Sequence, residues 1–430
     1  MMAAKNHNLR RLRSPTIDFH FSSAITSMDG QNSTFCDHIV VSSEHAVRQI
    51  ASSTAISWYK FLPANASKWQ LMCFFQSKQY LQTHTVPNAH PTDIFALATT
   101  PTQLLTVSGS SSIKVYNTRA QAIHADTADD DNAYPLVQTL EKVHPLGCHH
   151  ICAALGGTVA ASVGFGGEVK VWEIESEGGL WHARGTVVGE TDRADLIHTW
   201  NSLADLLHYV GEKGAGEHWA VALNEDGRYL AATTHDGRIN VYDTSTISST
   251  ATEIPTTKIA SYTTKGSFGM ALDISPSGNM TASGHQNGTV YIFNNTTQRL
   301  THSLTGLIKA VRSVKFSPAN TYLAAAGDAR IVALYDTTSG EQVANFTGHT
   351  SWVMTLDWNW SGEYLLSGAY DGKAKIWSLE RRECVATQTE GEKCLWAVKW
   401  LYKAASVRSE SFVTGAAGGM LAFYREAAGI

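Results

Sequence analysis

Apolar and polar residues alternate in short runs along residues 348–379, and turn residues separate the runs. A Gly-His pair opens the segment, and two apolar runs follow, the second of which ends at Ser367. Asp371-Gly372 then leads into a last run that ends at Trp377. An Asp-Gly pair between alternating apolar runs favours a tight hairpin, because both central residues of that turn have positive φ. The pattern predicts successive strands of one antiparallel sheet.

The Gly-His opening and the closing Trp about 30 residues later resemble the WD-repeat signature of a propeller blade. In that family a His, a Ser, an Asp and a Trp form a hydrogen-bonded chain inside the blade. The resemblance assigns these places to His349, Ser367, Asp371 and Trp377. The alternative is an isolated antiparallel sheet that carries the motif by chance.

One blade cannot bury both faces of its sheet, so the unit predicts copies of itself. Six further copies of the turn and the closing aromatic residue end at Tyr116, Trp172, Tyr242, Phe293, Tyr335 and Tyr424. From the turn residues, only the copy ending at Trp377 carries the whole His, Ser, Asp and Trp set. The repeats predict an all-β, seven-bladed propeller over residues 77–430.

The two ends of this region complement each other. The chain stops after what should be the third strand of blade seven, and residues 78–86 alternate as a strand does. We therefore expect residues 78–86 to close the ring as the missing outer strand and to remove an open edge. Residues 1–76 carry a small basic cluster but no repeat or sustained periodicity. We expect them to be disordered or not part of the working protein, with a targeting or nucleic-acid-binding arm as the alternative.

Two insertions interrupt the repeats. An acidic run at 125–131 is typical of a solvated loop. Residues 192–210 place apolar side chains at helical spacing, which predicts a helix that covers the side of the propeller or binds a partner. These side chains are Leu196, Trp200, Leu203 and Leu207.

Composition narrows the class of protein. Charged residues make up 17% and aromatic residues 10%, which suits sheets with large buried faces. A net charge of −5 argues against a general nucleic-acid surface. The six cysteines have no regular spacing, which indicates a reducing compartment. We expect a soluble intracellular protein, since no apolar run of about 18 residues or signal-peptide core is present.

Catalytic motifs are not found in the sequence. It contains no Gly-x-Ser-x-Gly elbow, no P-loop and no His-Glu-x-x-His. The densest group of ligand-type residues cannot direct all its side chains to one side of a strand, and no second cluster completes a tetrahedral set. This group is His144, Cys148, His149, His150 and Cys152. We expect no enzyme activity, no metal and no cofactor.

The candidate binding residues lie at the opening of the blades and just before the hairpin turns. In WD-repeat propellers these positions ring the narrower, partner-binding face. Aromatic side chains beside acids suit a short peptide that carries an Arg and a large apolar residue. The alternative is that several of the aromatic residues pack between blades. The partner-binding candidates are Asp93, Phe95, Glu217, Trp219, Phe268, Arg312, Trp352, Tyr370 and Trp396, with Phe165, His235 and Gln286 at further turns.

Four segments narrow the resemblance. HPTDIFALA, IKAVRSVKFSP, the segment around SWVM and the C-terminal FYREAAG are similar to the fungal WD-repeat subunit of the Ski (superkiller) complex. The similarity spans residues 77–430, and neither residues 1–76 nor 192–210 have a counterpart in it. Gly and Ala in the turns of blades five and seven depart from the pattern, which puts the hydrogen-bonded chains of those blades in doubt.

This resemblance implies a non-catalytic scaffold. Its partners would be a tetratricopeptide-repeat subunit and an RNA helicase that feeds messenger RNA to the cytoplasmic exosome for 3′ to 5′ decay. Fungal members also bind the meiotic topoisomerase-like protein in the nucleus, and both roles use a Gln-Arg-x-x-apolar motif. The implied location is cytoplasmic and nuclear, without direct contact to nucleic acid or membrane. The alternatives are an adaptor in a chromatin-linked transcription-elongation complex, as in animal relatives, and an enzyme with an active site on the propeller axis.

Overall fold

The structure is a computed structural model. The residues that it describes, apart from three short strands near the N-terminus, are 78–118, 133–174, 179–187, 218–246, 258–403, 407 and 409–427. The short strands β1 (Leu12–Ser14), β2 (Ile17–Phe21) and β3 (Ile39–Val40) form a small antiparallel sheet. The chain divides into two compact units, residues 1–75 with 428–430 and residues 76–427. The predictions of disorder for residues 1–76, an acidic loop at 125–131 and a helix at 192–210 lie outside the described residues, those three strands excepted.

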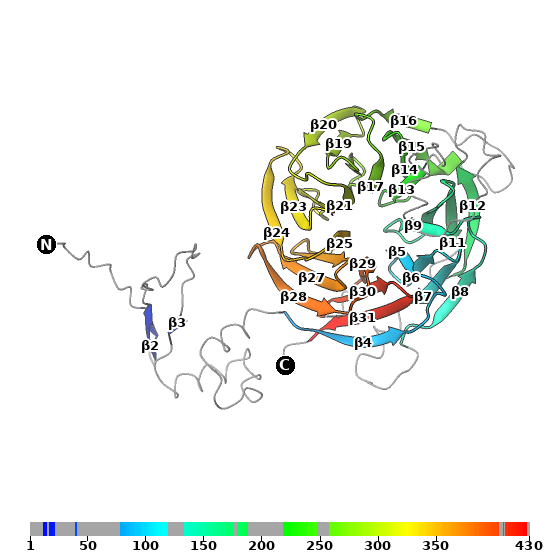
Figure 1. Ribbon diagram of the computed structural model, residues 1–430. Helices are drawn as coiled ribbons and strands as arrows, with labels where there is room; N and C mark the ends of the chain where they lie inside the picture. Colours follow the sequence, from blue (N-terminus) through cyan, green and yellow to red (C-terminus); the bar gives the residue numbers. More distant parts are fainter. Residues whose placement is uncertain are drawn as a thin grey trace. The chain divides into compact units, whose positions relative to one another are not determined.

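The larger unit is a ring of seven four-stranded antiparallel sheets around a central channel (Figure 1). In blades one to six, the strands follow one another in chain order from the channel to the rim. Blades one to three contain β5 (Ile94–Thr99), β6 (Gln103–Ser108), β7 (Ile113–Asn117), β8 (Leu136–Leu140); β9 (Cys148–Ala153), β10 (Val159–Gly164), β11 (Val169–Ile174), β12 (Trp181–Val187); β13 (His218–Leu223), β14 (Tyr229–Thr234), β15 (Ile239–Asp243) and β16 (Lys258–Tyr262). A short 3-10 turn, η2 (Thr244–Thr246), follows β15.

The remaining four blades repeat this arrangement. They contain β17 (Gly269–Ile274), β18 (Met280–His285), β19 (Val290–Asn294), β20 (Arg299–Leu304); β21 (Val311–Phe316), β22 (Tyr322–Gly327), β23 (Ile331–Asp336), β24 (Gln342–Thr347); β25 (Val353–Trp358), β26 (Tyr364–Ala369), β27 (Lys373–Ser378), β28 (Glu383–Thr389); β29 (Leu395–Trp400), β30 (Ser411–Ala416), β31 (Met420–Glu426) and β4 (Tyr80–Val86). The predicted all-β, seven-bladed propeller is confirmed. No helix among the described residues is long and apolar enough to span a bilayer.

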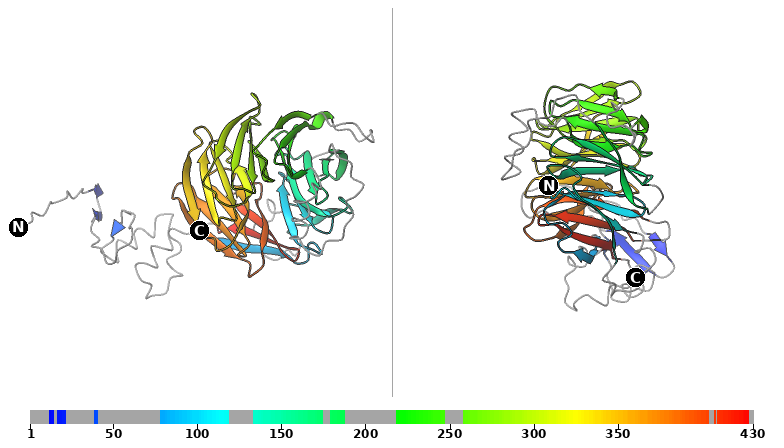
Figure 2. Two further views of the ribbon diagram at one scale, coloured as in Figure 1. Left: turned by 45° about the horizontal axis from the view of Figure 1, so that its top comes forward. Right: turned by 90° about the vertical axis from the view of Figure 1, so that its right-hand side faces the viewer.

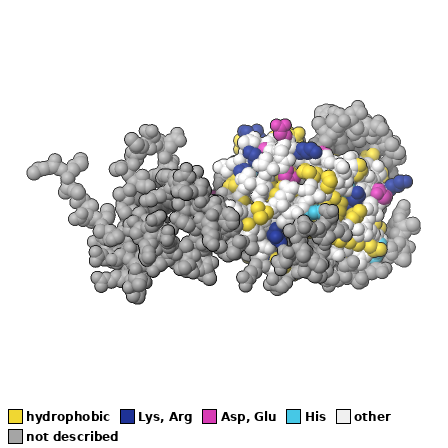
Figure 3. Space-filling model, turned by 90° about the horizontal axis from the view of Figure 1, so that it is seen from below, with side chains coloured by type: hydrophobic (Ala, Val, Ile, Leu, Met, Phe, Trp, Pro, Cys, Tyr) yellow, Lys and Arg dark blue, Asp and Glu magenta, His cyan; other side chains and the backbone are white. Residues whose placement is uncertain are grey.

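The core consists of seven apolar clusters, one between each pair of neighbouring blades. The sheets stand on edge around the channel, so that each packs against two neighbours (Figure 2). Blades seven and one, for example, join Phe423 and Val413 to Ile94 and Leu104. On the outer side, hydrophobic side chains gather in separate groups between polar surface (Figure 3). Each blade therefore depends on its neighbours for burial of its apolar faces.

The outer strand of blade seven comes from the beginning of the propeller sequence. β4 pairs antiparallel with β31, with Tyr80 opposite Glu426 and Val86 opposite Leu421. The strand also contributes the buried Tyr80 to the cluster between blades six and seven. The predicted closure of the ring by residues 78–86 is confirmed. Blade seven therefore has four strands, as the other blades do.

A hydrogen-bonded chain crosses the interior of blade six. His349 Nε2 and Ser367 Oγ are 2.8 Å apart, and Trp377 Nε1 donates to the same hydroxyl at 2.8 Å. His349 Nδ1 lies 3.1 Å from a carboxylate oxygen of Asp371. Gly372 completes the turn at φ +71°, where a Cβ would lie 2.2 Å from the carbonyl oxygen of Gly391. Only glycine fits there, which explains the Asp-Gly pair.

An equivalent chain is present in blade two, although its acid is Glu168 and not the Asp of the expected set. His144 Nε2 lies 2.8 Å from Ser162 Oγ, and Trp172 Nε1 donates to this hydroxyl at 2.9 Å. The turn position of the acid is Gly166, but Glu168 reaches back so that its carboxylate lies 3.1 Å from His144 Nδ1. A Cβ on Gly166 would lie 2.6 Å from that carboxylate, so Glu168 fills the space of the missing Asp. In both blades the His precedes the Ser by 18 residues. This spacing could have revealed the chain of blade two, although its turn residues do not match the pattern.

Blade seven uses a third version of this chain. Glu390 takes the place of the histidine, and its carboxylate accepts hydrogen bonds from the Thr414 hydroxyl and, at 3.1 Å, from the Tyr424 hydroxyl. Thr414 precedes Tyr424 by the same interval that separates Ser367 from Trp377. The doubt raised by the Gly residues in this turn is therefore resolved in favour of a polar chain with different members.

Removal of the serine hydroxyl that contacts both the His and the Trp should destabilise the protein, in blade two as in blade six. We expect Ser162→Ala and Ser367→Ala each to lower the free energy of unfolding by about 1–3 kcal/mol, because each leaves a buried imidazole and a buried indole N–H without their partner. Ser303→Ala, on the exposed face of the rim strand β20, is the control and should change it by less than about 0.5 kcal/mol. Urea unfolding measures all three. A loss for Ser367→Ala but none for Ser162→Ala would contradict the equivalence of the two chains.

Candidate partner-binding face of the propeller

Two kinds of loop emerge at one end of the propeller, which we call the upper face: those that join the second to the third strand of a blade and those that lead from one blade to the next. The opposite end is the lower face. The described upper-face loops are 87–93, 109–112, 141–147, 165–168, 235–238, 263–268, 286–289, 305–310, 328–330, 348–352, 370–372, 390–394 and 417–419.

Side chains from blades five, six, seven and one begin an aromatic arc on this face. The Arg312 guanidinium lies 4.8 Å from the ring centre of Trp352. The Trp352 ring is 5.9 Å from that of Tyr370, which lies 6.3 Å from Trp396. The Trp396 ring then packs edge to face on Phe95 at 5.3 Å. Tertiary structure thus joins candidates that lie up to 301 residues apart in the sequence numbering.

The arc continues over blades one to four. Phe95 packs against Phe165 at 5.5 Å, and His149 lies between Phe165 and Trp219 at 4.8 and 4.2 Å. Trp219 is followed by Phe268 at 5.2 Å, and Phe268 by His235 at 5.3 Å. His149 was not among the partner-binding candidates, although its place on the opening strand of blade two matches those of the other aromatic residues.

Exposure divides the arc into two parts. Trp352 and Tyr370 are 44% and 49% exposed, whereas His149 and Phe165 are 9% exposed. The remaining aromatic rings are half-buried. The arc therefore has a packed part over blades one to four and an open end at blade six. Part of the set serves blade packing, as the alternative interpretation expected, and a ligand can reach Trp352 and Tyr370.

Asp93 lies next to the open end, but its oxygens already accept hydrogen bonds. Trp396 Nε1 donates to Oδ2 at 3.0 Å, and the Gly418 N–H donates to Oδ1 at 2.7 Å. The sequence placed Asp93 beside Phe95 of its own strand, yet the indole that bonds it comes from blade seven. A carboxylate has about four acceptor positions, so these two bonds leave Asp93 capacity for an incoming cation.

Two candidates, Arg312 and Glu217, remain to be placed. Arg312 forms an ion pair with Asp328, in which Nη2 donates to Oδ2 at 3.2 Å while Nε donates to Oδ1. The guanidinium is thereby held over the Trp352 ring as part of the arc. Glu217 lies outside the described residues.

The five His and Cys residues of blade two lie in different surroundings. His144 belongs to the hydrogen-bonded chain of its blade, and His149 Nε2 donates to the Trp219 carbonyl at 2.8 Å. His150 and Cys152 line the central channel, while Cys148 is buried in the cluster between blades one and two. Within the part of the chain that the structure describes, no three His, Cys, Asp or Glu side chains gather as metal ligands would.

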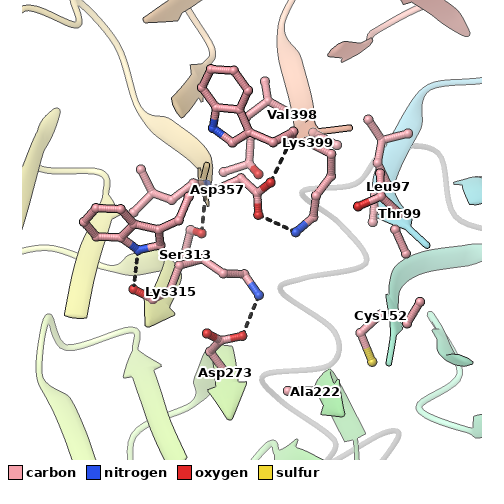
Figure 4. Close-up of a pocket in the computed structure, with 18 of the residues that line it drawn as sticks. Leu97, Thr99, Cys152, Ala222, Asp273, Ser313, Lys315, Asp357, Val398 and Lys399 are labelled. Atoms are coloured by element: carbon pink, nitrogen blue, oxygen red, sulfur yellow. Dashed lines mark hydrogen bonds and ion pairs between the residues drawn. The ribbon is translucent and has the colours of Figure 1, made fainter. Parts of the chain in front are cut away.

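The channel contains a charged arrangement that the sequence reasoning missed. Its cavity of about 480 Å³ is lined by the inner strands (Figure 4). Lys315 Nζ lies 2.6 Å from Asp273, and Lys399 Nζ lies 2.5 Å from Asp357. The free oxygen of each acid accepts a backbone N–H, from Phe316 and Trp400 respectively.

These four residues follow one another at intervals of 42 along the chain, one in each of blades four to seven. This 42-residue period could have revealed the charged arrangement from the sequence. Burial by itself would lower the pKa of Lys315, but the attraction of Asp273 outweighs it and holds the pKa above its usual value. Lys315 therefore remains charged. Each of the two ion pairs links the inner strands of two neighbouring blades.

Burial of histidines on and below the upper face makes stability depend on pH. Burial lowers the pKa of His90 to about 4 and that of His149 to about 3, from an ordinary value of 6.5. His149 Nδ1 is buried without a hydrogen-bond partner, so a proton there would have no acceptor. In the unfolded chain these two histidines take up protons below about pH 6.5. In the folded protein they stay neutral until the pH approaches their lowered pKa values. The stability contributed by these neutral histidines is complete above pH 6.5 and is lost as the pH falls.

We expect the free energy of unfolding to fall by about 2 kcal/mol for each of the two histidines between pH 7 and pH 5. Glu390 partly opposes this loss, because burial raises its pKa and the folded protein then takes up its proton first. His149→Phe should remove about one histidine's share of the fall, while the exposed His182→Gln should leave it unchanged. Urea titrations at the two pH values measure it. An equal fall in wild type and His149→Phe would contradict the prediction.

Comparison with known proteins agrees with this fold. Residues 213–243, 298–336 and 340–378 match the family model described as WD domain, G-beta repeat. The meiotic recombination protein rec14 of Schizosaccharomyces pombe is 34% identical over 351 residues, which cover 82% of this chain and 99% of rec14. This chain belongs to the rec14 family of WD-repeat proteins.

Two further relatives are similar to this chain. The antiviral protein SKI8 of Saccharomyces cerevisiae is 27% identical over 345 residues, which cover 72% of this chain and 82% of SKI8. A guanine nucleotide-binding protein subunit beta of Lymnaea stagnalis is 30% identical over 143 residues, covering 32% of this chain and 38% of the relative. The expected resemblance to a fungal, SKI8-like WD-repeat protein is confirmed. Two of the WD matches begin near the rim strand of one blade and end in the third strand of the next, so this member of the rec14 family is built of repeats that overlap adjacent blades.

Proposed function

We propose that this protein is a scaffold that binds short segments of partner proteins on its upper face. The observation that carries the proposal is the open end of the aromatic arc, where the exposed Trp352 and Tyr370 lie beside Trp396 and the acid that it bonds. An exposed aromatic pair next to a carboxylate suits a peptide with one large apolar residue and one cation. The channel lysines are held in ion pairs, and the histidines of blade two lie in different surroundings. Both observations favour a role without catalysis.

We take the expected partners from the resemblance to the WD-repeat subunit of the Ski complex. SKI8 is named an antiviral protein and rec14 a meiotic recombination protein. We propose that this chain acts with the tetratricopeptide-repeat subunit and the RNA helicase of the Ski complex in exosome-dependent 3′ to 5′ decay of messenger RNA. We further propose a second role in the initiation of meiotic recombination, through the topoisomerase-like protein. The protein would then work in both cytoplasm and nucleus, and a Gln-Arg-x-x-apolar motif would be the common ligand.

Affinity purification of the full chain from vegetative and meiotic fungal cells, followed by mass spectrometry, tests this proposal. Recovery of a tetratricopeptide-repeat protein and an RNA helicase from vegetative cells, and of the topoisomerase-like protein from meiotic cells, is the expected result. The same purification with Trp352→Ala should lose these partners, and with the lower-face Trp360→Ala it should keep them. Recovery of transcription-elongation factors in their place would contradict the Ski-complex assignment.

A further inference from the structure

On its blade-five side, the open end of the arc is bordered by positive charge, whereas loop 390–394 on its blade-seven side carries the exposed Glu392 beside the exposed Lys393. Among the described upper-face loops from 263–268 to 370–372, the exposed charged side chains are those of Lys265, Lys309 and Arg330. The acids of this sector are already engaged, because Asp328 pairs with Arg312 and Asp371 accepts hydrogen bonds inside blade six. The exposed cations of this sector stand in a protein whose net charge is −5.

An exposed aliphatic side chain lies within the same sector. Ile308 is 86% exposed, although the adjacent Leu307 is buried in the cluster between blades four and five. The loop that carries Ile308 and Lys309 continues into Ala310, whose carbonyl accepts the Asp328 N–H at 2.9 Å. An aliphatic group of this exposure beside cations extends the apolar surface of the open end toward blade five.

Direct contacts join this loop region to Trp352. Arg330 Nη1 donates to the Thr350 carbonyl at 3.4 Å, two residues before Trp352. Asp328 lies in the same turn as Arg330 and pairs with Arg312, which stacks on Trp352. The cations and the exposed rings thus belong to one continuous surface over blades five and six.

We propose that this surface takes a peptide whose apolar anchor residue is followed by acidic residues. The inference rests on the proposed function, and deepens it by assigning charge and direction to the ligand. If the motif's Arg lies over Asp93 and its apolar residue over Trp352 and Tyr370, the chain runs from blade one past blade seven to blade six. Three extended residues span about 10 Å, and Tyr370 lies only 6.3 Å, between ring centres, from Trp396, which bonds Asp93. The residues after the apolar position then lie over Lys309 and Arg330 of blade five.

Three synthetic peptides test this preference. They share the core Gln-Arg-Ala-Ala-Leu and end in Asp-Glu-Asp, Ser-Gly-Ser or Lys-Arg-Lys. We expect the full-length protein to bind the acidic peptide at least about tenfold more tightly than the basic one, with a difference that shrinks as salt is added. In the double variant Lys309→Glu with Arg330→Glu the order should reverse. The double variant Arg299→Glu with Arg382→Glu makes the same charge change on the rim and the lower face, and should keep the wild-type order.

A fourth peptide separates this inference from the proposed function. It carries Ala-Ala in place of Gln-Arg and keeps the acidic end. Equal binding of the three peptides with the intact core would overturn the acidic preference and leave the proposed function standing. Binding of the fourth peptide as tightly as the first would support the acidic preference but overturn the contact of the Arg with Asp93. Binding of none would overturn both, and displacement of the acidic peptide by a short oligouridylate would show a nucleic-acid site and overturn the inference.

Discussion

A chain that lacks residues 1–88 is expected to melt at least about 10 °C below the wild type, whereas removal of residues 1–76 shifts the melting temperature by less than about 2 °C. The first deletion removes β4, so β31 loses its ladder partner and blade seven exposes an open edge. It also removes Tyr80, which packs edge to face on Trp400 and Phe412 at 6.0 and 5.3 Å. Thermal melting followed by circular dichroism measures both truncations.

The beginning of β4 is anchored by a second set of contacts that the shorter truncation retains. Lys78 Nζ lies 2.9 Å from a carboxylate oxygen of Glu426 and 3.7 Å from one of Glu410, and it stacks 3.7 Å from the ring centre of Tyr364. The attraction of these acids outweighs burial and raises the pKa of Lys78. The two ends of the propeller sequence are thereby tied together next to the strand that closes the ring.

Two neighbouring residues of β4 provide a matched pair of substitutions. Tyr80→Ala should cost about 3–5 kcal/mol of unfolding free energy, because the ring is 4% exposed and its removal leaves a cavity between blades six and seven. Leu81→Ala, on the other face of the strand and 59% exposed, should cost less than about 1 kcal/mol. Similar losses for both variants, or equal melting temperatures for the two truncations, would contradict closure by this strand.

Trp352→Ala is expected to weaken binding of a Gln-Arg-x-x-apolar peptide by at least about thirtyfold, which corresponds to about 2 kcal/mol, the usual cost of a central aromatic anchor. Asp93→Lys should have a similar effect, because it replaces the acceptor for the motif's Arg with a like charge. Trp352 is 44% exposed, so its removal should leave the protein folded. Fluorescence anisotropy with a labelled peptide measures the affinities, and thermal melting checks the fold.

A tryptophan on the opposite face supplies the control. Trp360 lies in the loop between β25 and β26 of the same blade, is 41% exposed and packs on Tyr402 at 5.0 Å. It matches Trp352 in residue type and exposure, but belongs to the lower face. Trp360→Ala should bind the peptide as the wild type does. If Trp352→Ala and Asp93→Lys both retain wild-type affinity, the peptide site lies elsewhere on the protein.

The positions of individual contacts separate what could be expected from the sequence from what could not. Asp371-Gly372 and the closing Trp377 predicted their hairpin correctly, because a turn depends on residues that are adjacent in the chain. The expected turn type was wrong, since of the two turn residues only Gly372 has a positive φ. Glu168 could not be assigned in the same way. Its carboxylate fills the place of an Asp two residues earlier in the repeat, and only the folded turn brings it to His144.

The sequence by itself determined the number of blades, their order and the strand that closes the ring, because each blade is a local unit whose pattern recurs in register. Only the tertiary structure decided how the blades meet. Trp396 bonds Asp93 across the closure of the ring, 303 residues away, and Lys399 pairs with Asp357 of the preceding blade. It also decided which rings of the arc remain open, since Phe165 is covered by its neighbours while Trp352 is not. The physical reason is that such contacts depend on the curvature and closure of the whole ring, which no local spacing in the chain specifies.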